Sequence, residues 1–240
     1  MRYMQSFLSI VIPTLNEEKY LPNLLQCIKA QKLNDYEIIV SDGNSIDKTI
    51  KIAKKYGCKV VSSKISSPAH QRNKGAAVAK GNIILFLDAD SLVPDDFFIS
   101  ILAEFSKKDL DVASFFYNFN SKKMVYKIMT FWSNLNIKLI YRLHPLSAGA
   151  GILVKKKFHK KINGFDESLF IAEDHLYAKS IVQANGTYGL LRSKPILFNI
   201  RRFEKEGTLK VLLKWSYSIV YYLIFGPIKK KIIEYKFGEY

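Results

Sequence analysis

Short apolar segments alternate with amphipathic helical patterns along most of this 240-residue chain, and this alternation limits the fold more than any other feature. A short apolar run between turn residues predicts a buried strand, whereas apolar residues spaced at i, i+3, i+4 and i+7 predict a helix. The predicted strands are 8–13, 37–40, 59–61, 82–88, 112–119 and 152–154. The predicted helices are 21–28, 47–56, 69–80, 94–107, 122–142, 174–183 and 209–228. Strands that alternate with helices predict βαβ units, and therefore an α/β fold with a mostly parallel central sheet flanked by helices.

Polar side chains cluster where three of the predicted strands end. The clusters are Thr14–Glu17, Ser41–Asp47 and Asp88–Asp90. In open α/β sheets, ligands bind outside the carboxyl ends of the strands, so we expect a ligand site where these three segments meet. The sequence has no glycine fingerprint after the first strand and no phosphate-binding Gly-x-x-x-x-Gly-Lys loop. Dinucleotide-binding and P-loop proteins are therefore disfavoured.

Two carboxylates separated by one residue, Asp88 and Asp90, stand at the end of the strand predicted at 82–88. If the strand persisted to its end, both side chains would point to the same face. Two carboxylates beside a buried strand need a positive partner, and a divalent metal that bridges to substrate phosphates would supply one. The alternative is that both are solvated turn residues or caps for the helix that follows Pro94. A lone Asp-x-Asp motif does not decide between these two interpretations.

The charge balance favours an anionic partner without identifying it. The chain has 37 Lys and Arg against 21 Asp and Glu, a net charge of +16. Such an excess is typical of proteins that meet phosphates, nucleic acid or an acidic membrane surface. The two cysteines are too few for a disulfide or metal framework, which fits a reducing compartment. No secretory signal is recognisable, and the longest uncharged run, 215–228, contains Pro227 and is too short to span a bilayer.

Six sequence segments, taken together, resemble the family 2 glycosyltransferases, which have the GT-A fold. They are Ser9–Glu18 (SIVIPTLNEE), Val40–Thr49 (VSDGNSIDKT), Arg72–Ala76 (RNKGA), Phe86–Ser91 (FLDADS), Asn163–Glu167 (NGFDE) and the pair Glu173-Asp174. Their order and spacing are similar to those of the family over roughly residues 7–190. The resemblance implies a GT-A domain at 1–205, with a Rossmann-like, mostly parallel sheet. Its nucleotide-sugar half would be 1–95, its acceptor half 96–205, and 206–240 would be a basic, aromatic, amphipathic helical extension.

For the donor side, the resemblance implies roles for strand-end residues. Asp42 would accept hydrogen bonds from the nucleotide base, because an ionised carboxylate only accepts. Arg72 would meet the base or the diphosphate. Asp88 would face the ribose or the metal, and Asp90 would bind the metal directly, which is Mg²⁺ or Mn²⁺ in this family. The remaining residues implied in nucleotide-sugar binding are Pro13, Thr14, Glu17 and Ala89.

For the acceptor side, the resemblance implies that Asp174 is the general base and that Glu173 orients the acceptor or the base. In-line attack by the deprotonated hydroxyl would invert the anomeric configuration. Arg201 and Arg202 are candidates for a diphosphate clamp, and the alternative for them is a basic surface turn. Glu173 and Asp174 taken alone also fit a role as partners of a helix dipole.

Two donor-side residues keep alternatives of their own. Asp42 alone also fits an Asx turn, in which its side chain bonds to nearby backbone. Arg72 alone also fits a solvated helix face. The small-residue segment Leu146–Gly151 is expected to let backbone approach a ligand closely.

The segment 209–228 mixes aliphatic and aromatic residues with lysines and is followed by Lys229–Lys231. Interfacial membrane helices favour aromatic residues beside basic ones, and the segment 122–142 has the same pattern. This predicts peripheral binding to an anionic membrane surface, in which case the acceptor would be lipid-linked. The alternative is a helix that packs on the catalytic core or dimerises, and the sequence leaves the oligomeric state open.

The sequence therefore predicts a metal-dependent, inverting glycosyltransferase that uses a nucleotide-sugar, with UDP-sugars as the expected donors. We expect a glycan or lipid-linked hydroxyl or phosphate as acceptor, work on cell-envelope glycans, and a cytoplasmic location, peripheral on the inner face of the membrane. One alternative is a sugar-1-phosphate nucleotidyltransferase, although these begin with a glycine-rich loop that Thr14–Glu17 lacks. Another is a non-catalytic basic protein that binds membrane or nucleic acid, although that would not need carboxylates at strand ends. No nucleic-acid partner is expected.

Overall fold

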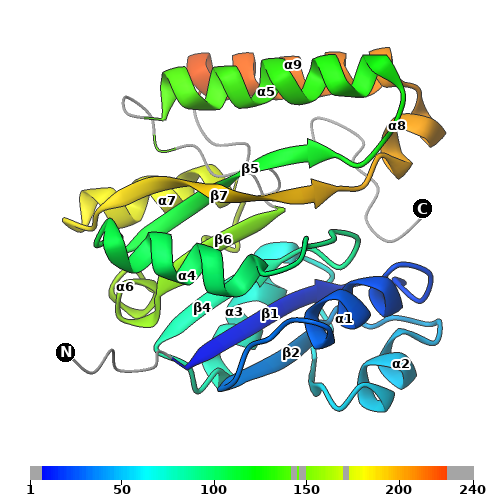
Figure 1. Cartoon of the computed structure of the whole chain (residues 1–240), viewed down its shortest axis with the longest axis vertical. Helices are drawn as coiled ribbons and strands as arrows, with labels where there is room; N and C mark the ends of the chain where they lie inside the picture. Colours follow the sequence, from blue (N-terminus) through cyan, green and yellow to red (C-terminus); the bar gives the residue numbers. More distant parts are fainter. Residues whose placement is uncertain (1–6, 142–144, 146–149, 170–172, 226–240) are drawn as a thin grey trace.

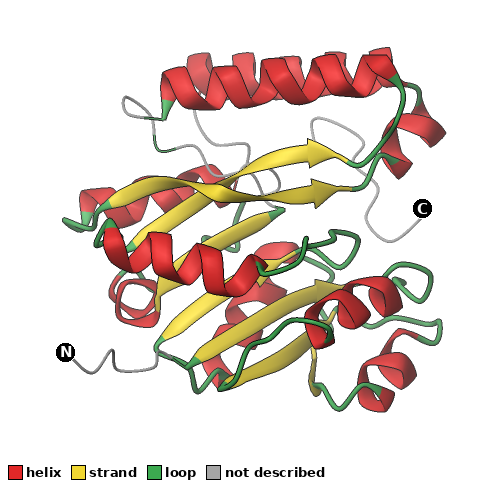
Figure 2. Cartoon of the chain, in the orientation of Figure 1, coloured by secondary structure: helices red, strands yellow, loops and turns green. Residues whose placement is uncertain are grey.

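The computed structural model describes residues 7–141, 145, 150–169 and 173–225, and within them a seven-stranded sheet has helices on both faces (Figures 1 and 2). The strands are β1 (Leu8–Thr14), β2 (Tyr36–Asp42), β3 (Lys59–Ser62), β4 (Ile83–Leu87), β5 (Val112–Phe119), β6 (Gly151–Lys155) and β7 (Tyr188–Phe198). The helices are α1 (Leu21–Lys29), α2 (Thr49–Lys55), α3 (Pro68–Val78), α4 (Phe97–Lys107), α5 (Met124–Ile140), α6 (Lys156–Lys161), α7 (Glu173–Gln183), α8 (Arg201–Glu206) and α9 (Thr208–Phe225). The predicted α/β class is confirmed.

The sheet order is β3-β2-β1-β4-β6-β5-β7, and β6 alone among these strands runs antiparallel to its neighbours. The carboxyl ends of β1, β2, β4, β5 and β7 therefore lie along one edge, and the arrowheads of β1, β5 and β7 point to the same side in Figure 1. Thr14 pairs with Asp42 at the ends of β1 and β2. The predicted mostly parallel sheet is confirmed, and its carboxyl edge collects all three polar clusters.

The central strands are buried on both faces, which explains their nearly continuous apolar sequences. Successive residues of one strand face opposite sides of the sheet. Ile10 and Leu85 pack into a core with α1 and α4, whereas Val11 and Phe86 pack into a second core with α3 and α7. Both cores lie against the same strands, so the strand ends that carry the polar clusters are held rigidly.

Strand β7 is the main element that the sequence pattern did not predict. A run of polar and helix-breaking residues, Arg192–Pro195, interrupts its apolar sequence. In the structure β7 is an edge strand paired with β5, and the register shifts between Phe115 and Tyr117. An edge position and a bulge are where a strand tolerates proline. At this irregularity, Glu104 of α4 accepts hydrogen bonds from the backbone N–H groups of Arg192 and Ser193. The short helices α6 and α8 were also not predicted.

The two long helices predicted at 122–142 and 209–228 are both present, and α5 is shorter than predicted. The helix predicted at 122–142 is α5, and the one predicted at 209–228 is α9 up to Phe225. The lysine cluster Lys229–Lys231 and most of the small-residue segment, 146–149, lie outside the described residues. Within the part that the structure covers, no helix is both long enough and apolar enough to cross a bilayer.

The small-residue segment also has a packing role at its last residue. A Cβ on Gly151 would lie 2.1 Å from Cδ1 of Ile196 and 3.2 Å from Cδ2 of Phe115. The glycine therefore lets β6 lie against side chains of β5 and β7. At this residue the structure shows close packing between strands, and the expected approach to a ligand stays a prediction.

Replacing Gly75 with alanine is expected to destabilise the fold, because α3 lies directly on β1 at this residue. An added Cβ would lie 2.3 Å from Cγ1 of Val11, closer than side chains tolerate. Overpacking of a buried site costs about 1–3 kcal/mol, which would lower the melting temperature by about 2–4 °C for each kcal/mol in a chain of this size. Thermal unfolding followed by circular dichroism measures the change. Lys74→Ala, at an exposed residue of the same helix, is the control and should leave the melting temperature nearly unchanged.

Candidate active site

At the ends of β1 and β2, the carboxylate of Asp42 joins two loops. Oδ1 accepts hydrogen bonds from Thr14 Oγ1 at 2.9 Å and Ser45 Oγ at 2.6 Å, and Oδ2 accepts one from Ser45 N at 2.8 Å. Gln71 of α3 adds a hydrogen bond from Nε2 to the Thr14 carbonyl at 2.9 Å. Asp42 is fully buried, so the structure shows it ordering the loop, as the Asx-turn alternative requires. Its contact with a nucleotide base stays a prediction.

At the end of β4, the two carboxylates do not follow strand alternation, because the strand stops at Leu87. Asp88 and Asp90 lie in the turn that follows and have different partners. Asp88 Oδ1 accepts a hydrogen bond from Arg72 Nη2 at 3.1 Å. Asp90 Oδ2 lies 2.9 Å from Nε of Arg201. The turn therefore presents two carboxylates at the sheet edge, each beside a different arginine.

Arg72 links two segments that lie far apart in the sequence. It projects from α3, is 3% exposed, and donates from Nη1 to Glu173 Oε1 at 2.6 Å while Nη2 meets Asp88. Burial raises the pKa of Glu173, although Arg72 opposes the shift and Asp174 adds to it. Burial likewise raises the pKa of Asp88 against the effect of Arg72. Arg72 is therefore no solvated helix residue, and its guanidinium holds the carboxylates of Asp88 and Glu173 together.

Arg201 is the second arginine of the site, and the end of β7 brings it there. Its Nη1 and Nη2 atoms donate to Glu17 Oε2 at 2.9 Å and Oε1 at 2.7 Å, while Nε faces Asp90. The guanidinium lies 4.4 Å from the ring centroid of Tyr20. Burial raises the pKa of Glu17, and Arg201 opposes that shift. Arg201 thus lies inside the site. Arg202 has a different neighbour, because its Nε atom lies 4.0 Å from Oε1 of Glu206 on the same helix.

The predicted general base, Asp174, stands at the start of α7 beside Glu173. Its Oδ1 accepts a hydrogen bond from His175 N at 2.8 Å, and its charge raises the pKa of Arg72. The side chain is 13% exposed, so it is partly sheltered and still reachable from solvent. Asp174, Glu173, Arg72 and Asp88 therefore form one continuous group of charges.

The turn Asn163–Glu167 sets the position of α7, and its supports were not singled out in the sequence. Asn73 of α3 donates from Nδ2 to the Phe165 carbonyl at 2.9 Å and accepts from Phe165 N at 2.8 Å. The Phe165 ring stacks on Tyr177 of α7 with centroids 3.9 Å apart. Asn73 directly follows Arg72, so the spacing of that motif was the signal that could have identified it.

The family model described as Glycosyl transferase family 2 matches residues 9–162, which is more than half of the chain. The chain belongs to glycosyl transferase family 2. The family predicted from the six sequence segments is thereby confirmed.

Named relatives of this family 2 chain match over most of its length. TarS of Staphylococcus aureus (strain Mu50), a poly(ribitol-phosphate) beta-N-acetylglucosaminyltransferase, is 25% identical over 189 residues, or 72% of this chain and 33% of TarS. RfbN of Salmonella typhimurium (strain LT2), an O-antigen chain rhamnosyltransferase, is 28% identical over 199 residues, or 74% of this chain and 61% of RfbN. The chain thus spans less than two thirds of the length of either relative.

Two solved structures share the fold of the family 2 chain. TarS residues 1–349 in complex with UDP-GlcNAc superposes with a TM-score of 0.63 at 22% identity, covering 80% of this chain and 58% of that one. The mannosyltransferase PcManGT from Pyrobaculum calidifontis, in complex with GDP-Man and Mn²⁺, gives 0.69 at 19% identity, covering 82% and 57%. These matches confirm the GT-A fold.

The site of this family 2 chain fits a divalent metal that arrives with a diphosphate. Among the residues described, no cluster of three or more His, Cys, Asp or Glu side chains could hold a metal ion. A Mg²⁺ ion that is held by one or two carboxylates and by substrate phosphate oxygens needs no such cluster. Asp88 and Asp90 supply hard oxygen donors at the sheet edge. Each already faces an arginine, so a metal ion would have to displace that guanidinium or share the carboxylate with it.

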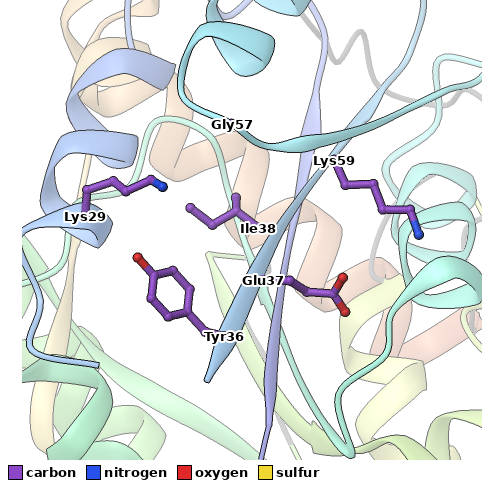
Figure 3. A pocket seen from close by; sticks show the side chains of 6 residues that line it. All are labelled: Lys29, Tyr36, Glu37, Ile38, Gly57 and Lys59. Atoms are coloured by element: carbon purple, nitrogen blue, oxygen red, sulfur yellow. The ribbon is translucent and has the colours of Figure 1, made fainter. Parts of the chain in front are cut away.

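An open hollow of about 380 Å³ lies at the amino ends of strands β2 and β3 in this family 2 chain (Figure 3). It is lined by Lys29, Tyr36, Glu37, Ile38, Gly57 and Lys59. Glu37 is already engaged, since its Oε1 accepts hydrogen bonds from Ser9 Oγ and Lys80 N. The hollow lies at the start of β2 and β3, away from the strand ends that carry the charged groups. It is therefore separate from the candidate active site.

Acid is expected to destabilise the support beneath α7 through His159. Burial, helped by Lys156, lowers the pKa of His159 to about 4, and its Nδ1 lies 2.9 Å from the Tyr177 hydroxyl. His159 binds a proton near pH 6.5 in the unfolded chain and only near pH 4 in the folded chain. The stability that depends on a neutral His159 is therefore fully present above about pH 6.5 and is lost as the pH falls toward 4. A difference of this size corresponds to about 3 kcal/mol. Denaturant unfolding between pH 4 and 7 measures the slope, and His159→Gln should flatten it; an equally steep slope in the variant would contradict this account.

Proposed function

We propose that this chain transfers a sugar from a nucleotide-sugar, with UDP as the expected nucleotide, to a glycan hydroxyl with inversion at the anomeric carbon. The observation that carries this proposal is Arg72, which holds Asp88 of the donor half and Glu173 of the acceptor half on one guanidinium. Such a bridge would bring the donor phosphates and the acceptor chemistry within one side chain of each other. The relatives support it, since TarS is named for N-acetylglucosamine transfer and has a solved complex with UDP-GlcNAc.

On the donor side, the carboxylates of Asp90 and Asp88 would hold Mg²⁺ or Mn²⁺, which supplies charge neutralisation for the diphosphate leaving group. Arg72 and Arg201 would exchange their carboxylate partners for diphosphate oxygens, because a guanidinium binds either group in a bidentate manner. Arg202, in the first turn of α8, would also bind the diphosphate. The proposed base and ribose contacts come from Pro13, Thr14, Glu17, Asp42 and Ala89.

On the acceptor side, Asp174 would take the proton of the attacking hydroxyl, and Glu173 would hold Arg72 and the acceptor in place. The division of labour follows from the contacts. Glu173 is committed to Arg72 at 2.6 Å, whereas the contacts of Asp174 run through its own helix start. A base must be reachable by its substrate, and of the two Asp174 is the carboxylate less occupied by the arginine.

We further propose that the acceptor is a cell-envelope glycan and that the chain works at the cytoplasmic face of the membrane. TarS is named for a poly(ribitol-phosphate) acceptor and RfbN for the O-antigen chain, so both act on envelope polymers by name. A lipid-linked acceptor would bring the reaction to the membrane surface.

Calorimetric titration with UDP and with GDP, each with and without Mn²⁺, tests the donor part. We expect UDP to bind with Mn²⁺ at least about tenfold more tightly than without it, because the metal shares its charge between the carboxylates and the diphosphate. Absence of any metal-dependent binding of UDP or GDP would contradict the proposal. A screen of nucleotide-sugars for slow hydrolysis without acceptor would then identify the sugar.

A further inference from the structure

Helix α5 is fixed on the sheet by polar contacts, so its outward face is defined. Asn134 donates from Nδ2 to the Tyr117 carbonyl at 2.7 Å and accepts from Tyr117 N at 3.0 Å. Thr130 Oγ1 accepts from Phe119 N at 3.1 Å. These bonds satisfy backbone groups of β5 and leave the helix a single rotational setting. The residues on its other side must therefore face away from the sheet.

That outward face of α5 is apolar and exposed. The exposed fractions are 67% for Met124, 51% for Ile128, 63% for Phe131, 56% for Trp132 and 65% for Leu139. Their spacing of i, i+4, i+7, i+8 and i+15 places them along one side of the helix. Isolated exposed apolar residues need no explanation, but a continuous stripe with two large aromatic side chains marks an interaction surface.

The first half of α9 carries a second exposed apolar stripe. Leu209 is 72% exposed, Leu213 62% and Tyr217 51%, again at helical spacing. The opposite side of α9 packs inward, where Val211 joins Tyr126 of α5 in a small buried cluster. Figure 1 shows α5 and α9 at the same end of the molecule, next to α8. We call the outward faces of the two helices the α5–α9 platform.

The charges on the platform select its partner. Neither α5 nor α9 contains an Asp or Glu, and Lys127, Lys138 and Lys210 on the two helices are all exposed. A second copy of the chain would bring lysines against lysines, in a chain that already carries a net charge of +16. Exposed aromatic side chains among lysines are instead typical of helices that lie in the interface of a membrane with anionic lipids.

We propose that the α5–α9 platform docks on an anionic lipid surface, with the aromatic side chains in the headgroup region and the lysines at the phosphates. α8 connects α9 to Arg201, so docking would hold the sheet edge close to the bilayer. Presentation of a lipid-linked acceptor to Asp174 rests on the proposed function, whereas the docking itself does not.

Flotation of the full chain with vesicles tests the docking. We expect at least about tenfold more binding to vesicles with 30% phosphatidylglycerol than to pure phosphatidylcholine, because each surface lysine contributes about 1 kcal/mol of attraction. Phe131→Ser with Trp132→Ser, and separately Lys127→Glu with Lys138→Glu, should each reduce binding about tenfold or more. Lys54→Glu with Lys55→Glu makes the same charge change at exposed residues of α2 and should reduce binding far less.

The outcomes separate docking from catalysis. Equal losses in the α2 and α5 charge variants, or no binding to anionic vesicles, would overturn the proposal. So would a concentration-dependent dimer in sedimentation analysis that Phe131→Ser with Trp132→Ser abolishes. Metal-dependent UDP binding should be unchanged in all these variants, since none lies in the candidate site. Loss of vesicle binding with intact UDP binding therefore bears on the platform alone.

Discussion

Asp174→Asn should lower kcat by about 10²–10⁴-fold and leave metal-dependent donor binding within about twofold of the unchanged chain. General-base catalysis contributes an effect of this size, and asparagine keeps the shape of the side chain while losing the capacity to take a proton. Asp174 Oδ1 accepts from His175 N, and an asparagine oxygen can replace it there, so the start of α7 should stay intact. Transfer kinetics and calorimetric UDP titration on the same preparation measure both quantities.

Two further variants make this result specific. Glu173→Gln should disturb donor binding as well as rate, because the Arg72 guanidinium that meets Asp88 also donates to Glu173 at 2.6 Å. Asp35→Asn makes the same chemical change at an exposed residue at the opposite edge of the sheet and should leave both quantities unchanged. If Asp174→Asn kept full rate while Glu173→Gln lost it with donor binding intact, the roles of the two carboxylates would be reversed.

The sequence predicted that the strand-end carboxylates lie along one edge of the sheet, because that edge depends on local patterns. A short apolar run indicates the strand of each βα unit. Parallel strands bring their carboxyl ends to the same edge of the sheet, whatever the details of packing. The placement of Asp42, Asp88 and Asp90 along one edge followed from this rule alone. Their individual partners did not follow, since β4 stops before Asp88 and the turn directs the two carboxylates to different arginines.

The sequence could not predict how the arginines are shared among the carboxylates. Arg201 reaches Glu17 across most of the chain because β7, an edge strand with a proline and an irregular register, comes near the segment after β4 only in the folded sheet, where Leu197 forms a bridge with Leu92. Arg72 meets Glu173 because the turn before α7 is fastened to Asn73. Both arrangements depend on long-range packing, which has no signal in local periodicity.

If Asp90 holds a metal ion as proposed, Arg201 would compete with that ion for the carboxylate, and we then expect results of opposite sign in two measurements. In the structure the Arg201 Nε atom lies 2.9 Å from Asp90 Oδ2, so a cation already satisfies the proposed metal ligand. Arg201→Gln should therefore raise the affinity for Mn²⁺ alone by about tenfold, since a hydrogen bond to a charged group contributes about 1.5–3 kcal/mol. The same variant should weaken UDP binding in the presence of Mn²⁺, because the diphosphate loses a bidentate partner.

Asp90→Asn should show the complementary loss. Even partners outside the coordination shell change metal affinity by about 10–100-fold, so removal of a direct ligand should weaken Mn²⁺-dependent UDP binding by at least about 100-fold. Transfer should fall at least as far. Electron paramagnetic resonance of free Mn²⁺ measures metal binding without nucleotide, and calorimetry measures UDP binding. An unchanged Mn²⁺-dependent affinity in Asp90→Asn would remove this carboxylate from the metal site.

A second variant protects the Arg201 result from a folding artefact. Removing Arg201 alone would leave the Glu17 carboxylate buried without its bidentate partner, which is strongly destabilising. Glu17→Gln with Arg201→Gln removes both charges and should restore stability while keeping the higher affinity for Mn²⁺. If Mn²⁺ bound more weakly in both variants, Arg201 would be an anchor for Asp90 and no competitor. If the metal affinity rose and UDP binding fell, the arginine would be a cation that exchanges Asp90 for the diphosphate during each cycle of donor binding.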